Sequence, residues 1–181
     1  FLAIRHVHFH HTMGVPTRLW GLPHDLGVKY NYTLHDFWVI NANPTQTDIS
    51  GIYVPRTDAD RDRKCAERYP LPEGIDGWQW RQSQLPLMKS ARYLICPSFD
   101  TATRIKSEKE YSDLNTWLVA PHLDHGQLPF DVRRFNPEGM AVRVVVLGAL
   151  SKEKGADILE QTAIALSTEN IEFHLLGYAY L

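Results

Sequence analysis

A strand–loop–helix segment at residues 142–159 contains residue types suited to binding a phosphate group. A run of valines ends at Gly148, and a short loop leads to Lys154 and Gly155, which open a helix. Glycine lets the backbone turn sharply and come close to a ligand. The helix N-terminus offers unpaired N–H groups and a positive dipole end, and Lys154 adds a full charge. The segment lacks the P-loop ending and the dinucleotide fingerprint, so by itself it fits an ordinary turn with a solvated lysine better.

The pair His35–Asp36 is a second candidate, at the end of a strand expected over residues 28–35. A histidine at a strand's carboxyl end, beside an aspartate, can donate or accept a hydrogen bond or relay a proton. Ligands of parallel sheets bind beyond these carboxyl ends. From the residues alone, a surface or core histidine is the simpler interpretation.

A histidine cluster near the start of the sequence suggests a competing chemistry. His6, His8 and His10 alternate along an expected strand and therefore project on one face. Two imidazoles at that spacing can bind one Zn²⁺, which makes a metal-dependent hydrolase using His6 and His8 the main alternative. A barrel of that enzyme type needs about 250 residues. Because this chain has 181, we expect the histidines to be structural or to line a substrate site.

Hydrophobic patterning places these candidates on alternating strands and helices. Strands are expected at 3–10, 28–35, 92–98, 116–122, 142–149 and 170–177. Helices are expected at 17–27, 77–91, 99–110 and 154–167, with Pro86 as a potential kink and Ser98 or Asp100 as an N-cap. This alternation predicts an α/β fold with Rossmann-like parallel sheets. Residues 41–76 show no clear period and are expected to form a long, partly ordered excursion of the kind that is often functional.

Composition excludes several classes of protein. A net charge of -2 gives no basic excess of the kind that nucleic-acid binding requires. Two cysteines exclude a disulfide scaffold and fit a reducing cytoplasm. We expect Cys96 to be a buried thiol and Cys65 to lie in a charged loop where it could be reactive. The alternating Asp58, Asp60 and Asp62 are expected to form a solvated charge run. No apolar stretch approaches the roughly 18 residues that span a bilayer.

The domain organisation predicted from the sequence has two incomplete parts. Residues 123–140 have a linker composition, after which the strand–helix–strand pattern restarts. We therefore expect residues 1–135 to be the later part of one Rossmann-like domain. Residues 136–181 would be a linker and the first βαβ unit of another. Because the sequence begins without methionine and ends as a crossing loop starts, we expect an internal fragment of a longer protein.

Four segments together resemble glycosyltransferase family 4, whose members have the GT-B fold. VRVVVLGALSKEKGADILEQTA is similar to the start of the family's C-terminal domain, although Ala149 stands where the family often has arginine. HVHFHHTMGVPTRLWGLPHDLGVKYNYTLHDFW contains the family's His-rich strand, helix and T-L-H-D strand in order. GWQWRQSQLPLMKSARYLICPSFDTATRI and VAPH resemble the segments that follow. The variety most similar is that of bacterial surface-polysaccharide synthesis.

The resemblance implies a retaining transfer of a sugar from a nucleotide-diphosphate donor to a saccharide or lipid-linked acceptor, without a bound metal or a permanent cofactor. It assigns His35 and Asp36 to catalysis. It further implies that the donor is held by Gly148, Ser151, Lys154 and Gly155, and that the cleft is lined by Ser98 and His122. A cytoplasmic location, with peripheral contact at the inner face of the membrane, follows by analogy. A non-catalytic module of the same fold is the remaining alternative.

Overall fold

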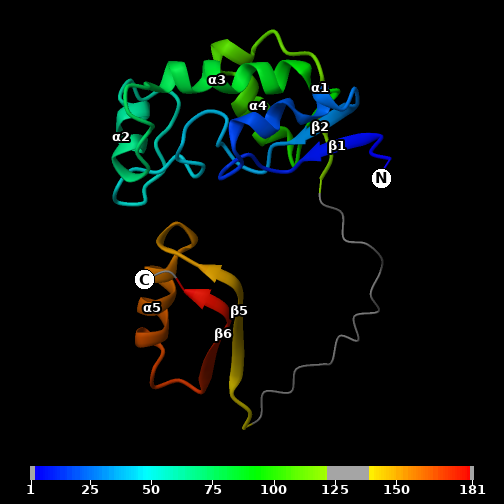
Figure 1. The fold of residues 1–181 in the computed structure, drawn as a ribbon. Coiled ribbons are helices and arrows are strands. Elements are labelled where there is room, and N and C mark those ends of the chain that lie inside the picture. Colours follow the sequence, from blue (N-terminus) through cyan, green and yellow to red (C-terminus); the bar gives the residue numbers. More distant parts are fainter. Residues whose placement is uncertain (1–2, 122–138, 180–181) are drawn as a thin grey trace. The chain divides into compact units, whose positions relative to one another are not determined.

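The computed structural model describes residues 3–121 and 139–179 of the chain. The chain divides into two compact units, an N-terminal unit, Phe1–Leu123, and a C-terminal unit, Asp124–Leu181 (Figure 1). The domain boundary predicted at residue 135 falls outside the described residues. Among the residues that are described, no helix is long and apolar enough to cross a membrane.

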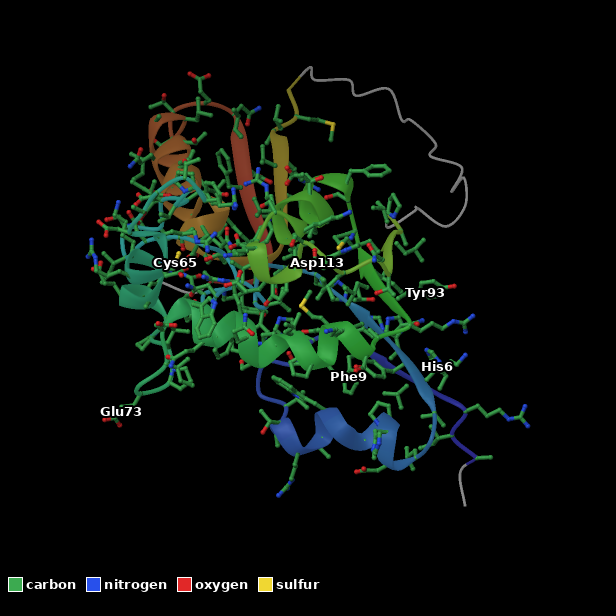
Figure 2. The ribbon with its side chains drawn as sticks, turned by 90° about the horizontal axis from the view of Figure 1, so that it is seen from above. His6, Phe9, Cys65, Glu73, Tyr93 and Asp113 are labelled. Atoms are coloured by element: carbon green, nitrogen blue, oxygen red, sulfur yellow. The ribbon has the colours of Figure 1, made fainter. Side chains whose placement is uncertain are left out.

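The N-terminal unit is built on a four-stranded parallel sheet in the order β1-β2-β3-β4. Its strands are β1 (His6–Phe9), β2 (Lys29–Thr33), β3 (Tyr93–Cys96) and β4 (Trp117–Val119). Figure 2 shows His6 and Tyr93, the first residues of β1 and β3, toward the same end of the sheet, as parallel pairing requires. The predicted α/β class and parallel sheet are confirmed, with strands shorter than their apolar runs.

Helices connect these strands. They are η1 (Thr17–Gly21), α1 (Leu22–Asp25), α2 (Arg61–Arg68), α3 (Gly77–Ser90), α4 (Phe99–Lys106) and η2 (Lys109–Tyr111). Helix α3 begins at a capping box in which the Asp76 carboxylate accepts from Gln79 N while the Gln79 side chain accepts from Asp76 N. It continues through Pro86 to its last turn. The predicted helix at 99–110 is divided into α4 and η2.

One face of α3 forms the centre of the core. Its buried residues recur at the helical period and are Gly77, Trp80, Arg81, Gln84, Leu87 and Met88. Leu87 and Met88 pack with Tyr30, Tyr32 and Leu94 of the sheet, all of them 8% exposed or less. The Tyr30 hydroxyl donates to Leu87 O at 2.5 Å, which gives this buried hydroxyl a hydrogen-bond partner.

Buried ion pairs attach the excursion at 41–76 to the rest of the unit. Arg61 of α2 donates two hydrogen bonds to Glu108, at 2.6 and 3.2 Å, and both side chains are less than 10% exposed. Arg81 of α3 reaches Asp62 at 3.0 Å and Glu110 at 3.1 Å. The predicted solvated charge run is therefore wrong for Asp62, because the carboxylate neutralises a guanidinium that lies against the core.

Both cysteines of the N-terminal unit are buried. Cys96 lies in β3, as predicted. Cys65 lies on α2 rather than in a charged loop, and its side chain has no exposed surface (Figure 2). Burial raises the pKa of each thiol to about 11. The expectation that Cys65 could be reactive is wrong, because a buried thiol resists forming the thiolate that reacts.

The C-terminal unit is a βαβ unit, as predicted. It contains β5 (Val142–Leu150), η3 (Lys152–Lys154), α5 (Ala156–Ala165) and β6 (Ile171–Ala179). The two strands pair in parallel along their whole length, with Gly148 opposite Gly177. A Cβ atom on Gly177 would lie 2.0 Å from Gly148 O, so this close approach requires glycine.

Candidate functional site

The parallel pairing of β1 with β2 brings two histidine-containing segments together at the carboxyl ends of the strands. In this register His8 lies opposite Asn31 and Phe9 opposite Tyr32. Toward the carboxyl ends of the two strands, His8 Nε2 lies 2.8 Å from Thr33 Oγ1, and just beyond the strands His10 Nδ1 lies 3.2 Å from His35 Nε2. Each contact joins residues 25 positions apart, so one strand register creates both.

Three imidazoles form a continuous row, which we call the histidine row: His8, His10 and His35. The rings of His8 and His10 are stacked with centroids 4.2 Å apart, and those of His10 and His35 are stacked at 5.5 Å. Burial lowers the pKa of His8, and the neighbouring His10, His6 and His35 lower it further. A hydrogen bond between two imidazole nitrogens needs one donor and one acceptor, so His10 and His35 share a single proton across their contact.

A second pair beside the row fixes the tautomer of His11. His11 Nδ1 accepts from the backbone N–H of Met13 at 2.8 Å. Its Nε2 atom must therefore carry the proton that is donated to Asp36 Oδ2 at 2.9 Å. The other oxygen of Asp36 accepts from the Trp38 backbone N–H at 2.9 Å. Both carboxylate oxygens are thus engaged in shaping the turn after β2.

Trp38 adds an aromatic surface and a hydrogen-bond donor to this end of the sheet. Its ring lies 5.9 Å from His11 and packs edge-on against Trp80 at 4.8 Å. The Trp80 indole N–H donates to Trp38 O at 2.8 Å, which holds the backbone in place. Within the described residues, the indole N–H of Trp38 is buried and has no acceptor. Sequence reasoning missed Trp38 and Thr33, although both lie within three residues of His35.

The arrangement gives little support to the metal site considered from the sequence. His6 and His8 are both exposed on one side of β1, as their alternation predicted. His8 Nε2, however, is already bonded to Thr33. Within residues 3–121 and 139–179, no three or more His, Cys, Asp or Glu side chains are grouped to hold a metal ion.

Of the two predicted cleft-lining residues, one can be described. Ser98 is the N-cap of α4: its hydroxyl oxygen accepts from Thr101 N at 3.1 Å and lies 3.0 Å from Thr101 Oγ1. The N-cap alternative for Ser98 is confirmed, so its hydroxyl stabilises the first turn of the helix. His122 lies outside the described residues.

The four residues predicted to bind the donor lie along one stretch of the C-terminal unit. Gly148, with φ +95°, is inside β5, which continues one residue further than predicted. Ser151 O accepts from the backbone N–H groups of Lys154 and Ala156, at 3.0 and 3.1 Å. Gly155, with φ +80°, joins η3 to α5 in a left-handed conformation that suits glycine.

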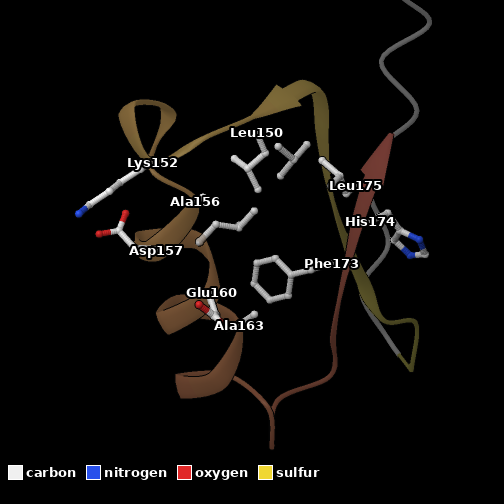
Figure 3. Close-up of a pocket in the computed structure, with 11 residues that line it drawn as sticks. Leu150, Lys152, Ala156, Asp157, Glu160, Ala163, Phe173, His174 and Leu175 are labelled. Atoms are coloured by element: carbon white, nitrogen blue, oxygen red, sulfur yellow. The ribbon is translucent and has the colours of Figure 1, made fainter. Parts of the chain in front are cut away.

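Two cavities flank α5, and they separate the lysines of this stretch. Lys152 and Asp157 lie at the rim of a cavity of about 550 Å³ whose wall includes Leu150 and Phe173. Figure 3 shows Phe173 pointing into the space between α5 and β6, while the Lys152 side chain extends away. Lys154 and Gly155 instead line a second cavity, of about 520 Å³. Lys152 and Lys154 therefore line different cavities and do not share one phosphate-binding site.

Comparison with known proteins gives no relative for this chain: no family model, no curated protein and no solved structure matches it. The fold and site define a mixed α/β protein with a four-stranded parallel sheet and a histidine row at the carboxyl ends of two adjacent strands.

Proposed function

We propose that this protein is a retaining glycosyltransferase of the family 4 type, with a GT-B architecture. The observation that carries the proposal is the histidine row, which occupies the carboxyl ends of β1 and β2. Ligands of parallel α/β sheets bind at these ends. Sugars offer many hydroxyl groups and apolar ring faces; the row supplies ring nitrogens, and His11, the residue after His10, lies against the aromatic ring of Trp38.

The histidines have different roles in this proposal. His35 is exposed and contacts a hydroxyl group of the donor sugar or the acceptor. His10 contacts His35 Nε2 and thereby helps to orient the His35 ring. Asp36 is a positioning residue, because its oxygens bond to His11 and to the Trp38 backbone. This changes the expectation that Asp36 takes a direct part in catalysis.

The donor side of the proposal rests on the sequence resemblance and on the C-terminal unit. Lys154 binds the diphosphate, with the backbone near Gly148, Ser151 and Gly155 beside it. Charge on the leaving group is stabilised by these donors and by cations rather than by a bound metal. A saccharide or lipid-linked acceptor, at the cytoplasmic face of a membrane, completes the proposed reaction.

Replacing His35 in the natural protein that carries this sequence tests the acceptor side. With a panel of nucleotide-diphosphate sugars, we expect His35→Ala to lower kcat for nucleoside diphosphate release by about 100-fold. His24→Ala is the matched control, because that imidazole lies on α1 with a side chain 95% exposed. Equal losses in both variants, or none in His35→Ala, would refute the role of His35. Saccharide binding without any transfer would favour the non-catalytic module.

Replacing Lys154 tests the donor side separately. Calorimetry of the same protein with its donor is expected to show roughly tenfold weaker binding for Lys154→Ala, the effect of losing one charge-assisted hydrogen bond. Lys152→Ala is the matched control, because Lys152 belongs to the same turn but lines the other cavity. Unchanged donor affinity in Lys154→Ala would remove Lys154 from the donor site.

A further inference from the structure

A cavity in the N-terminal unit lies between the excursion, α2 and α4. Its volume is about 210 Å³. Three guanidinium groups line it, those of Arg56, Arg61 and Arg104, together with the Tyr53 and Gln46 side chains. No member of the histidine row lines this cavity, so its chemistry is separate from that of the proposed transferase site.

The cations of the cavity outnumber its carboxylates. Glu108 is the one acidic residue of the wall. It accepts both hydrogen bonds of the buried Arg61, while Arg56 Nε remains 3.8 Å away with a side chain 58% exposed. Arg104 is paired with Asp100 at 2.8 Å and donates to the Tyr53 hydroxyl. Arg61 also pairs with Asp62 at 3.2 Å, so Arg56, whose carboxylate partner Glu108 is 3.8 Å away and already bonded to Arg61, is the guanidinium of the wall that an anion would complement.

Gln46 gives an independent indication of a ligand. Its side chain is 3% exposed and belongs to the cavity wall, yet its Nε2 donor has no acceptor within the described residues. The backbone of Gln46 is fixed, because its carbonyl accepts from Val54 N at 2.8 Å and its N–H donates to Asn43 O at 3.2 Å. A buried amide donor without an acceptor is unfavourable, and an oxygen atom in the cavity would satisfy it.

We propose that this cavity binds a small oxyanion, a phosphate group either free or as the ester of a small molecule. Arg56 and Arg104 supply charge and N–H donors, and Gln46 supplies a neutral donor from the buried side. Arg61 is held by Glu108 and Asp62, which balance its charge, and it forms part of the wall. The guanidinium groups match the oxygen geometry of a phosphate better than that of a spherical ion. This binding does not depend on sugar transfer.

Calorimetry of the 181-residue chain with inorganic phosphate, at constant ionic strength, tests the proposal. We expect saturable binding that Arg56→Gln weakens about tenfold, since one charge-assisted contact is lost. Arg63→Gln is the matched control. Like Arg56, Arg63 has an exposed side chain, but it lies on α2, pairs with Asp60 and Glu67, and does not line the cavity. That variant should bind phosphate as the wild type does.

A second variant, Gln46→Met, and a second ligand, glucose 6-phosphate, test the proposal further. Gln46→Met removes the neutral donor at similar volume, and it too should weaken phosphate binding while leaving the melting temperature close to that of wild type. Tighter binding of glucose 6-phosphate than of phosphate would identify the ester as the occupant, and equal binding would identify the free ion. Absence of saturable binding in the wild type, or equal weakening by Arg56→Gln and Arg63→Gln, would overturn the proposal.

Discussion

His10 and His35 come from two different strand ends and meet through ring nitrogens 3.2 Å apart, with nearly parallel rings. Their contact pairs one donor nitrogen with one acceptor nitrogen. His8 also stacks on His10, and its Nε2 atom contacts Thr33. The geometry of the row therefore depends on the pairing of β1 with β2.

The stability of the N-terminal unit should fall as the pH is lowered through the range where His8 titrates. Burial and the neighbouring histidines lower the pKa of His8 from its ordinary value of 6.5. The unfolded chain then binds the proton more readily than the folded chain, so stability is full above pH 6.5 and decreases as the pH falls through the lowered value. Calorimetric melting between about pH 7.5 and about pH 5 measures this decrease.

The variant His8→Asn should make the decrease in stability smaller, and the control variant His24→Asn should leave it unchanged. An equally steep decrease in His8→Asn would contradict the assignment.

The strands and their order along the chain could be predicted because they depend on local patterns. Runs such as YLIC and VRVVV are apolar and β-branched, and they lie in β3 and β5. The D-G-W-Q sequence at Asp76–Gln79 likewise carries its own helix start, since the capping box forms between residues three positions apart. His35 could be proposed as a site residue because it directly follows such a strand.

The partners of these residues could not be predicted from local pattern. His10 meets His35 only because β1 and β2 pair in one register, which the sequence of neither strand specifies alone. Arg61 is buried only because Glu108 lies opposite it, 47 positions later in the chain. Charged residues are mostly exposed unless they are paired, so without knowledge of that partner the sequence predicts a solvated cluster, with Cys65 in a charged loop.

Removing Glu108 should destabilise the N-terminal unit strongly. Glu108→Ala leaves the buried Arg61 guanidinium without its bidentate partner, and the loss expected for a broken buried pair is about 3–5 kcal/mol. Glu67→Ala is the matched control, because Glu67 pairs with Arg63 at the surface and should cost less than about 1 kcal/mol. Urea unfolding followed by tryptophan fluorescence measures both. A similar loss of unfolding free energy in the two variants would mean that the buried Arg61–Glu108 pair stabilises the unit no more than a surface pair does.

A side chain at position 177 should separate β5 from β6. The Cβ atom of Gly177→Ala would meet Gly148 O at 2.0 Å, and the backbone φ of +157° adds strain. We expect a loss of about 1–3 kcal/mol or more, the range for forced overpacking. It should be visible as faster amide hydrogen exchange along β6. Gly21→Ala is the control, because nothing lies within 4 Å of its Cβ position. Unchanged exchange in Gly177→Ala would show that the strands do not approach this closely.

Both thiols should be inert in the folded protein and reactive once it unfolds. Burial raises the pKa of Cys65 and of Cys96 to about 11, so the reactive thiolate is scarce at about pH 8. Titration with a chromogenic disulfide reagent should detect almost no thiol in buffer and two per chain in denaturant. Cys96→Ala isolates the response of Cys65, which depends on the packing of α2 and the excursion rather than on the sheet. Rapid labelling of Cys65 in that variant, while its melting temperature stays near that of wild type, would mean that α2 does not bury its thiol and that the charged-loop interpretation was right.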